Sequence, residues 1–228
     1  MKRDKPILVI LGNPPYNAFA GVVVDEERDL TDAYRVARST KQPQGQGLND
    51  SYVRFFRMDE RRIVEQTGKG IAFFISNYSW LDGLSFSAMR ERYLEVFDRI
   101  WIDSLNGGKY KTGKLTPEGE PNPSVFSTEW NREGIQVGIA IALLVRKNDH
   151  AESHVIRFRH LWRRGKRAEL LASVEQDGET LYQPVEPPND LGLPFVPVHS
   201  LWIISPGRSC RISFGGRRQA LTLVGTIC

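Results

Sequence analysis

The tetrapeptide Asn13-Pro14-Pro15-Tyr16 contains residue types that can act on an aromatic amine. An exocyclic amine on a nucleobase is a poor nucleophile, because its lone pair is delocalised into the ring. The Asn13 side-chain carbonyl and the Pro14 main-chain carbonyl can accept both amine protons, which favours a tetrahedral nitrogen with a free lone pair. The prolines stiffen the loop, and Tyr16 offers a ring face for the base. The tetrapeptide predicts group transfer to a base amine, and the alternative is a turn that only closes a strand.

The tetrapeptide follows a segment that we expect to form a buried strand. Residues 7–11 are a continuous apolar run with charge before it and Gly12 after it, a pattern typical of a strand in a parallel sheet covered by helices. In open α/β sheets, ligands bind at the carboxyl ends of the strands. Asn13 to Tyr16 therefore lie where we expect the chemistry.

The segments that follow alternate between helical and strand patterns. We expect a long loop over 13–48, a helix from Asn49 or Asp50 to about Gln66, a strand over 71–76, a helix over about 85–96 and a strand over 99–105. This order predicts βαβ units and a mostly parallel α/β sheet. Further along, the patterns indicate a loop over 106–124, a strand over 135–146 in a hairpin with Val125-Phe126, a strand near 155–158, a helix near 161–172 and a proline-rich linker or irregular domain start over 184–197.

Several segments in the same order resemble a known enzyme family. Asn-Pro-Pro-Tyr after an apolar strand resembles motif IV of the amino-methyltransferases, most closely the N6-adenine enzymes. The resemblance extends over roughly residues 3–197 to the methylase portion of Type ISP and Type IIG restriction–modification proteins. It rests on 48–56 (LNDSYVRFF), on 70–76 followed by Asn77-Tyr78-Ser79-Trp80, on 113–117 (GKLTP) and on 123–128 (PSVFST).

The resemblance implies a fold and an activity. It implies part of a Rossmann-like class I methyltransferase sheet, from motif IV onward, with an irregular C-terminal extension. The implied activity is site-specific adenine methylation of double-stranded DNA, with S-adenosylmethionine as donor and a flipped adenine as acceptor, within a restriction–modification system.

The resemblance also implies roles for aromatic and amide side chains beyond the tetrapeptide. Asn77 and Tyr78 would line the pocket, although Asn77 fits the role of a plain strand-end cap equally well. Phe126 would stack on the face of the base opposite Tyr16. The alternatives are that Phe126 is a core aromatic and that Trp130 takes the stacking role.

The cofactor-binding signals of this family are missing. No Phe-x-Gly-x-Gly occurs, and only twelve residues precede Asn13. Without the strands that carry those signals, the strand at 7–11 would present an apolar edge. We therefore expect a truncated piece of a larger enzyme that lacks the main cofactor site and that works with the remaining part of the same enzyme. The alternative is a catalytically inactive nucleic-acid-binding remnant.

The resemblance implies three regions. We expect residues 1–148 to be the C-terminal half of the catalytic domain, 149–198 a basic linker and start of a target-recognition region, and 199–228 an atypical tail, for which we hypothesise a frameshift near residue 199. Both cysteines, Cys210 and Cys228, lie in that tail, and only four histidines are present, so neither a disulfide framework nor a metal site is expected. No export signal and no membrane span are indicated, which favours a cytoplasmic protein.

The net charge of +4 and the pI near 9.1 favour a polyanionic partner, although a solvated charged face would give the same composition. The candidates for contacts with the DNA backbone are Lys109, Lys111, Lys114, Arg163, Arg164, Lys166 and Arg167. Residues 108–114 also fit Gly-x-x-x-x-Gly-Lys, a nucleotide-binding pattern. Leu115 lacks the hydroxyl that such a loop supplies to Mg²⁺, and the prolines that follow forbid the required helix, so a basic loop near DNA is the better interpretation. No nuclease cluster is visible.

Overall fold

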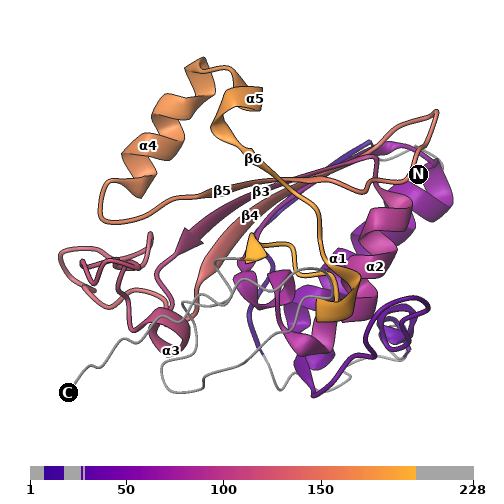
Figure 1. Ribbon diagram of the computed structural model, residues 1–228, viewed down its shortest axis with the longest axis horizontal. Coiled ribbons are helices and arrows are strands. Elements are labelled where there is room, and N and C mark those ends of the chain that lie inside the picture. Colours follow the sequence, from indigo (N-terminus) through magenta and orange to yellow (C-terminus); the bar gives the residue numbers. More distant parts are fainter. Residues whose placement is uncertain (1–7, 18–26, 28, 199–228) are drawn as a thin grey trace, which may run out of the picture.

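The computed structural model describes residues 8–17, 27 and 29–198. Six strands form one sheet in the order β1-β2-β4-β3-β5-β6 (Figure 1). Their bounds are β1 Val9–Gly12, β2 Gly70–Asn77, β3 Arg99–Asn106, β4 Ile139–Arg146, β5 Ile156–His160 and β6 Gln183–Val185. The α/β fold expected from the sequence is confirmed.

The strand directions are more mixed than the sequence predicted. β1 pairs with β2, and β3 with β5, in parallel, so these four strands run the same way. β4 lies between β2 and β3 and is antiparallel to both, and β6 is antiparallel to β5. The predicted hairpin between β4 and Val125-Phe126 is wrong, because both edges of β4 are already occupied by β2 and β3.

Helices cover both faces of the sheet. α1 (Ser51–Glu60) and α2 (Ser87–Val96) lie on one side, and α4 (Lys166–Ala172) lies on the other (Figure 1). α1 continues as a π-helical segment, Arg61–Thr67, which ends at Gly68 with a positive φ of 77°. The helices expected over about 50–66 and 85–96 are confirmed, whereas the one expected from 161 begins at Lys166. The remaining short helices are α3 Lys109–Thr112 and α5 Gly178–Leu181, with 3-10 turns at Asp32–Tyr34, Gly47–Asn49, Tyr78–Leu81, Leu84–Phe86, Ser173–Glu175 and Asn189–Leu191.

Successive residues of β4 point to opposite faces and so divide the core into two clusters. Ala140, Ala142 and Leu144 belong to the larger cluster, in which the aromatic rings of α1 and α2 pack. The smaller cluster, which we call the far-face cluster, consists of Leu105, Ile139, Ile141 and Leu161. Tyr16, Val125 and Leu170 of α4 pack against it.

The segment expected to be a linker packs into the fold. β6 lies within it, the backbone N–H of Phe195 donates to the Leu81 carbonyl at 2.6 Å, and the Phe195 side chain is fully buried. β5 and β6 extend the same sheet as the preceding strands. The functional division at residue 148 stays a prediction, and the structure shows no separate body after it within the described residues.

Other expectations concern residues outside the described part. The frameshift, the atypical tail at 199–228, Cys210 and Cys228 all lie there. Within residues 8–17, 27 and 29–198, no group of three His, Cys, Asp or Glu side chains could hold a metal ion. No helix in that part is long and apolar enough to cross a membrane.

Candidate functional site

The Asn13–Tyr16 loop begins at the carboxyl end of β1, where the sequence placed it. Asn13 is exposed, Pro14 is buried and Tyr16 is partly buried. The Tyr16 hydroxyl donates to Asn13 Oδ1 at 3.2 Å and lies 3.4 Å from the Ile75 carbonyl. Because a carbonyl oxygen has two lone pairs, Asn13 Oδ1 can still accept a second hydrogen bond. The loop thus presents an oriented acceptor at the end of a strand.

The surroundings of Tyr16 keep its hydroxyl a donor. Burial, followed by the nearby Asp50 carboxylate, raises the pKa of Tyr16 to about 12. The ring meets that of Tyr52 edge-on, with 6.3 Å between centroids. Asp50 stands at the N-cap position of α1, as predicted, but its side chain makes no capping hydrogen bond, and Asp50 Oδ1 accepts from the Asn17 backbone N–H at 2.8 Å. Asp50 thereby ties the end of the loop to the start of α1.

An apolar groove runs beside the loop between β1 and α1. We call this open space of about 500 Å³ the loop groove. Its lining is Ile10, Leu11, Gly12, Asn13, Pro14, Pro15, Phe55, Met58, Asp59, Arg62 and Phe74. Gly12 is required here, since a Cβ would lie 2.7 Å from the Phe74 ring. The exposed Leu8, Val9 and Leu11 continue the apolar surface along β1, which pairs only with β2 among the described residues.

Asp59 is the one buried charged group that lines the loop groove. Its residue is 3% exposed, and neither carboxylate oxygen has a hydrogen-bond partner in the described structure. Burial, followed by repulsion from Glu60, raises the pKa of Asp59 to about 7. The sequence analysis missed Asp59, which lies four residues after the exposed Phe55 in the same helix. The spacing of four residues between them, one helical turn, is the signal that puts both on one face.

Asn77 and Tyr78 lie at the end of β2. Asn77 Oδ1 accepts from the Ser79 backbone N–H at 2.9 Å and from Ser79 Oγ at 2.8 Å, which is the strand-end cap that the sequence left open. The Tyr78 side chain is 7% exposed and packs so closely on Gly138 that a Cβ there would lie 1.2 Å from its ring. The Lys111 ammonium lies 4.8 Å from the centre of the Tyr78 ring. A contact of either residue with a base stays a prediction.

The two aromatic candidates for stacking are both exposed. Phe126 is 39% exposed, so it is not the core aromatic that the sequence allowed. Trp130 is 96% exposed. Phe126 lies within a tight turn in which the Ser127 backbone N–H donates to the Ser124 carbonyl at 3.0 Å. Its stacking role stays a prediction.

The candidates for DNA-backbone contacts are side chains bonded within the protein, exposed side chains, and the buried Lys166. Lys111 is paired with Asp82, Lys114 Nζ donates to the Glu133 carbonyl, and Arg163 is paired with Glu120. Lys109 is exposed, as are Arg164 and Arg167.

Lys166 differs from the other basic candidates and requires a correction. Its side chain is 2% exposed, and Nζ donates to the Leu105 carbonyl at 2.7 Å, Asn122 Oδ1 at 2.7 Å and the Pro123 carbonyl at 2.9 Å. The three donors of an ammonium group are all used, so Lys166 is not placed to contact DNA. Burial lowers its pKa to about 8.

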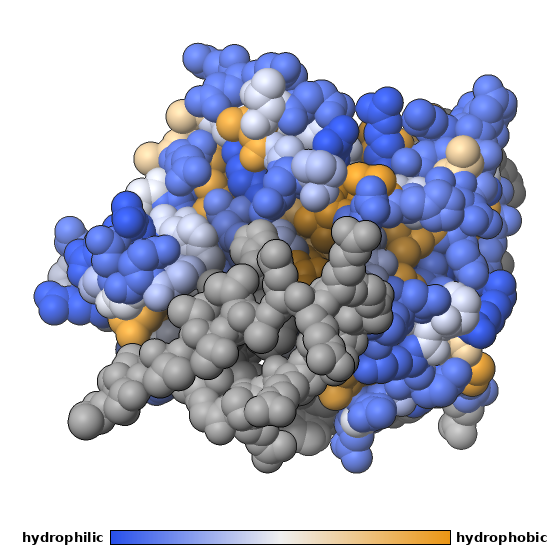
Figure 2. All heavy atoms as spheres, in the orientation of Figure 1, coloured by the Kyte–Doolittle hydropathy of each residue, from blue (hydrophilic) through white to orange (hydrophobic). Residues whose placement is uncertain are grey.

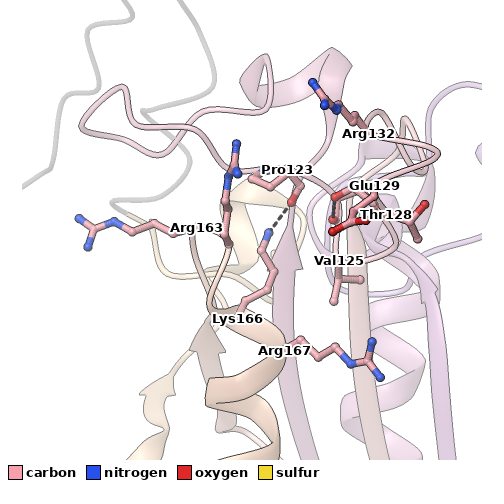
Figure 3. Close-up of a pocket in the computed structure, with 11 residues that line it drawn as sticks. Pro123, Val125, Thr128, Glu129, Arg132, Arg163, Lys166 and Arg167 are labelled. Atoms are coloured by element: carbon pink, nitrogen blue, oxygen red, sulfur yellow. Dashed lines mark hydrogen bonds between the residues drawn. The ribbon is translucent and has the colours of Figure 1, made fainter.

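A second pocket lies between the loop that follows α3 and the start of α4. Five cationic side chains and one carboxylate line this space of about 790 Å³, which we call the basic pocket (Figure 3). Its lining is Pro123, Ser124, Val125, Ser127, Thr128, Glu129, Arg132, Arg163, Arg164, Lys166 and Arg167. Figure 2 shows mostly hydrophilic side chains over α4. Arg132 was missed from the sequence, because it lies about thirty residues before the arginine cluster that it faces.

No family model matches this sequence, and no curated protein matches it. Solved structures do match its fold. The Type ISP restriction-modification enzyme LlaBIII bound to DNA is 24% identical over 81% of this chain, with a TM-score of 0.63. A nuclease-deletion mutant of the Type ISP enzyme LlaGI with a DNA substrate mimic is 23% identical over 81%, with a TM-score of 0.61, and the DrdV–DNA complex is 24% identical over 85%, with a TM-score of 0.58.

The chain spans a small part of those proteins. The match covers 12% of LlaBIII, 18% of LlaGI and 18% of DrdV. At this identity the similarity establishes a shared fold. LlaBIII and LlaGI are Type ISP restriction-modification enzymes, a class that the sequence motifs also resemble.

Proposed function

We propose that this chain carries the amine-activating loop of a DNA methyltransferase that methylates the N6 amine of adenine in a restriction–modification system. The observation that carries the proposal is the placement of Asn13-Pro14 at the carboxyl end of β1, with the Asn13 acceptor oriented by Tyr16. The shared fold with LlaBIII and LlaGI supports it. Such an activity on DNA belongs in the cytoplasm.

The loop would activate the amine by hydrogen bonding. Asn13 Oδ1 and the Pro14 carbonyl accept the two amine protons, and the nitrogen becomes tetrahedral with its lone pair directed outward. The nitrogen would form its bond to the methyl carbon as the methyl–sulfur bond breaks and the neutral thioether leaves, and it would then release one proton to solvent. S-adenosylmethionine, when bound, supplies an electrophilic methyl group on a sulfonium centre. Pro15 stiffens the loop, so little reorganisation is needed when the amine arrives.

The target base must leave the duplex to reach the loop. We assign Tyr16 and Phe126 to its two faces, with Asn77 and Tyr78 at the pocket edge. Residues 1–148 would form the catalytic region, and residues 149–198 the start of a target-recognition region. Recognition of a particular sequence would belong to the longer protein.

The loop groove fits part of the cofactor. Phe55, Met58 and Phe74 offer apolar walls that suit a purine ring, and Asp59 offers a buried acceptor without a partner in the described structure. A buried carboxylate without a donor is costly, so a ligand with hydrogen-bond donors would relieve that cost. The glycine-rich motif that holds most of this cofactor in the family is not found in the sequence. The groove would therefore supply one wall of the cofactor site.

Methyl transfer tests the proposal directly. The chain is combined with the remaining part of the same enzyme, which we expect to supply the main cofactor site. The complex is incubated with S-adenosylmethionine carrying a labelled methyl group and with DNA that lacks methylated adenine, and nucleosides are identified by mass spectrometry. We expect N6-methyladenine, and a loss of about 10²–10³-fold in rate for Asn13→Ala, as for other lost oxyanion-type contacts. The matched control is Asn148→Ala, an exposed asparagine in the turn after β4.

Two results would contradict the proposal. One is incorporation that is equal in Asn13→Ala and the wild type. The other is DNA binding by the wild type with no methyl incorporation at all, which is the behaviour of an inactive nucleic-acid-binding remnant.

A further inference from the structure

We propose that the basic pocket binds a phosphate of the nucleic acid backbone, with Arg132 on one wall and Arg164 and Arg167 on the other. This inference rests on the proposed function in one respect, that DNA is the partner. It assigns a binding site to residues outside the amine-activating loop. The grounds are the unpaired charge, the hydroxyl groups that keep a hydrogen to donate, and the rigidity of the two walls.

The three arginines carry charge that the described protein does not neutralise. Arg163 is paired with Glu120, whereas no ion pair or hydrogen bond is found for the Arg132, Arg164 and Arg167 side chains within the described residues. Glu129 is the one carboxylate in the lining. Guanidinium groups bind phosphate oxygens through two parallel N–H donors, so unpaired arginines that line one pocket favour a phosphate ligand.

Two hydroxyl groups among the lining residues keep a hydrogen that they can donate. Ser124 Oγ accepts from the Phe126 backbone N–H at 3.3 Å, and Thr128 Oγ1 accepts from the Asn131 backbone N–H at 2.9 Å. Each hydroxyl still has its own hydrogen to donate, because accepting a bond uses only a lone pair. Ser127 differs, since its Oγ donates to the Ser124 carbonyl at 2.5 Å. A ligand that offers only acceptors, as a phosphodiester does, matches Ser124 and Thr128.

Lys166 holds the two walls at a fixed separation. It projects from the start of α4, and its ammonium group is bonded to Asn122 and Pro123 of the opposite wall and to the end of β3 (Figure 3). Asn122 Oδ1 also accepts from the Arg163 backbone N–H at 3.0 Å. Because these bonds are buried, the arginines need little ordering of the backbone when a ligand binds.

The position of the pocket suits a backbone close to the proposed target base. Val125 lines the pocket and packs against the far-face cluster, against which Tyr16 of the amine-activating loop also packs. Phe126 is the next residue after Val125. The pocket is open on one side, as a site for one link of a long polymer must be. An open, arginine-lined site of this kind favours a nucleic acid over a free small anion.

Salt-dependent DNA binding tests the proposal. Fluorescence anisotropy with a short labelled duplex gives the dissociation constant of the 228-residue chain over a series of salt concentrations. For Arg164→Ala/Arg167→Ala we expect weakening of at least about tenfold at low salt, and a decrease of about one in the slope of log K against log salt per lost phosphate contact. Arg132→Ala should show a smaller loss of the same kind.

The matched control removes two positive charges at the other end of the sheet. Arg99 begins β3 and Lys147 follows β4, and both are exposed. Arg99→Ala/Lys147→Ala should leave the salt slope close to that of the wild type. Arg164→Lys/Arg167→Lys, which keeps the charge, should retain most of the slope. Thermal melting of each variant separates lost binding from lost folding.

Several results would overturn the proposal. These are an equal loss in the control and pocket variants, no DNA binding by the folded wild type, and binding of inorganic phosphate at low concentration by a wild type that binds no duplex. Failure of the methyltransferase proposal is distinguishable from failure of this one. If no methyl transfer is detected while the arginine variants lose DNA affinity, the pocket stands. If methyl transfer occurs and the arginine variants bind DNA as well as the wild type, the pocket is refuted.

Discussion

The loop groove and the basic pocket differ in charge and in how their buried ionisable groups are satisfied. The loop groove is apolar, and its buried Asp59 has no partner in the described structure. The basic pocket is cationic, and the ammonium group of its buried Lys166 donates three hydrogen bonds. A satisfied buried charge fixes its surroundings, whereas an unsatisfied one is a cost that a ligand or another segment can remove.

Because of this difference in charge, the loop groove and the basic pocket suit different ligands. The apolar walls of the loop groove and its acceptors, Asp59 and Asn13, suit a neutral ring with donors. The basic pocket offers donors from its guanidinium and hydroxyl groups against one carboxylate, Glu129, and suits an anion. Substitutions of the two buried charges and of the hydroxyl that orients Asn13 test this contrast.

Lys166→Met should have the largest effect of the three on stability. It removes the ammonium group but keeps a long apolar side chain, and it leaves the Leu105 and Pro123 carbonyls and Asn122 Oδ1 without that donor. Each buried acceptor left unsatisfied costs about 1–3 kcal/mol, so we expect a loss of about 4 kcal/mol in the free energy of unfolding. Urea denaturation measures this. Lys147→Met, at an exposed lysine, should change stability by less than about 0.5 kcal/mol, and a similarly small change for Lys166→Met would refute the bracing role.

Asp59 should make stability depend on pH. Its folded pKa of about 7 lies above the usual value of 3.8, so the folded state binds more protons than the unfolded state between these values. Stability from this group is therefore highest at low pH and falls as the pH rises toward 7. Between pH 5 and pH 8 we expect a loss of about 2–3 kcal/mol.

The variant Asp59→Asn tests whether the Asp59 carboxyl group causes this pH dependence of stability. The difference in unfolding free energy between pH 5 and pH 8 should shrink in this variant and stay unchanged in Asp149→Asn, at an exposed aspartate in the turn after β4. Should Asp59→Asn retain the full pH dependence of the wild type, the carboxyl group is not the source.

Tyr16→Phe should have the smallest effect on stability. It keeps the ring and removes the hydroxyl that donates to Asn13 Oδ1 and lies near the Ile75 carbonyl. One such hydrogen bond contributes about 1 kcal/mol, and we expect a loss of that size together with a methyl-transfer rate reduced by about tenfold. The control is Tyr110→Phe, at a tyrosine that is 82% exposed. A rate unchanged by Tyr16→Phe would show that the hydroxyl does not orient Asn13.

Local sequence patterns were sufficient for the parts of the fold that depend on neighbours along the chain. The apolar run before Gly12 predicted the strand β1, although Val9 and Leu11 are exposed and not buried as expected. The helix predicted to end at about Gln66 ends at Thr67. The Asn13 loop follows β1 directly, so its position was predictable as well. Chain periodicity could not place β4 between β2 and β3, because strand order depends on which buried faces meet across the sheet.

The sequence by itself was sufficient to predict amine activation by the Asn13–Tyr16 loop, since four adjacent residues contain both the carbonyl acceptors and the two prolines that stiffen the backbone. The tertiary structure alone decided which charges are buried. Lys166 stands in the sequence next to the exposed Arg163, Arg164 and Arg167, and only the approach of Asn122 and Pro123 makes it a brace rather than a DNA contact. Arg132 joins that pocket from another segment for the same reason. A side chain's charge is fixed by its type, but its role depends on the desolvation and partners that distant segments bring to it.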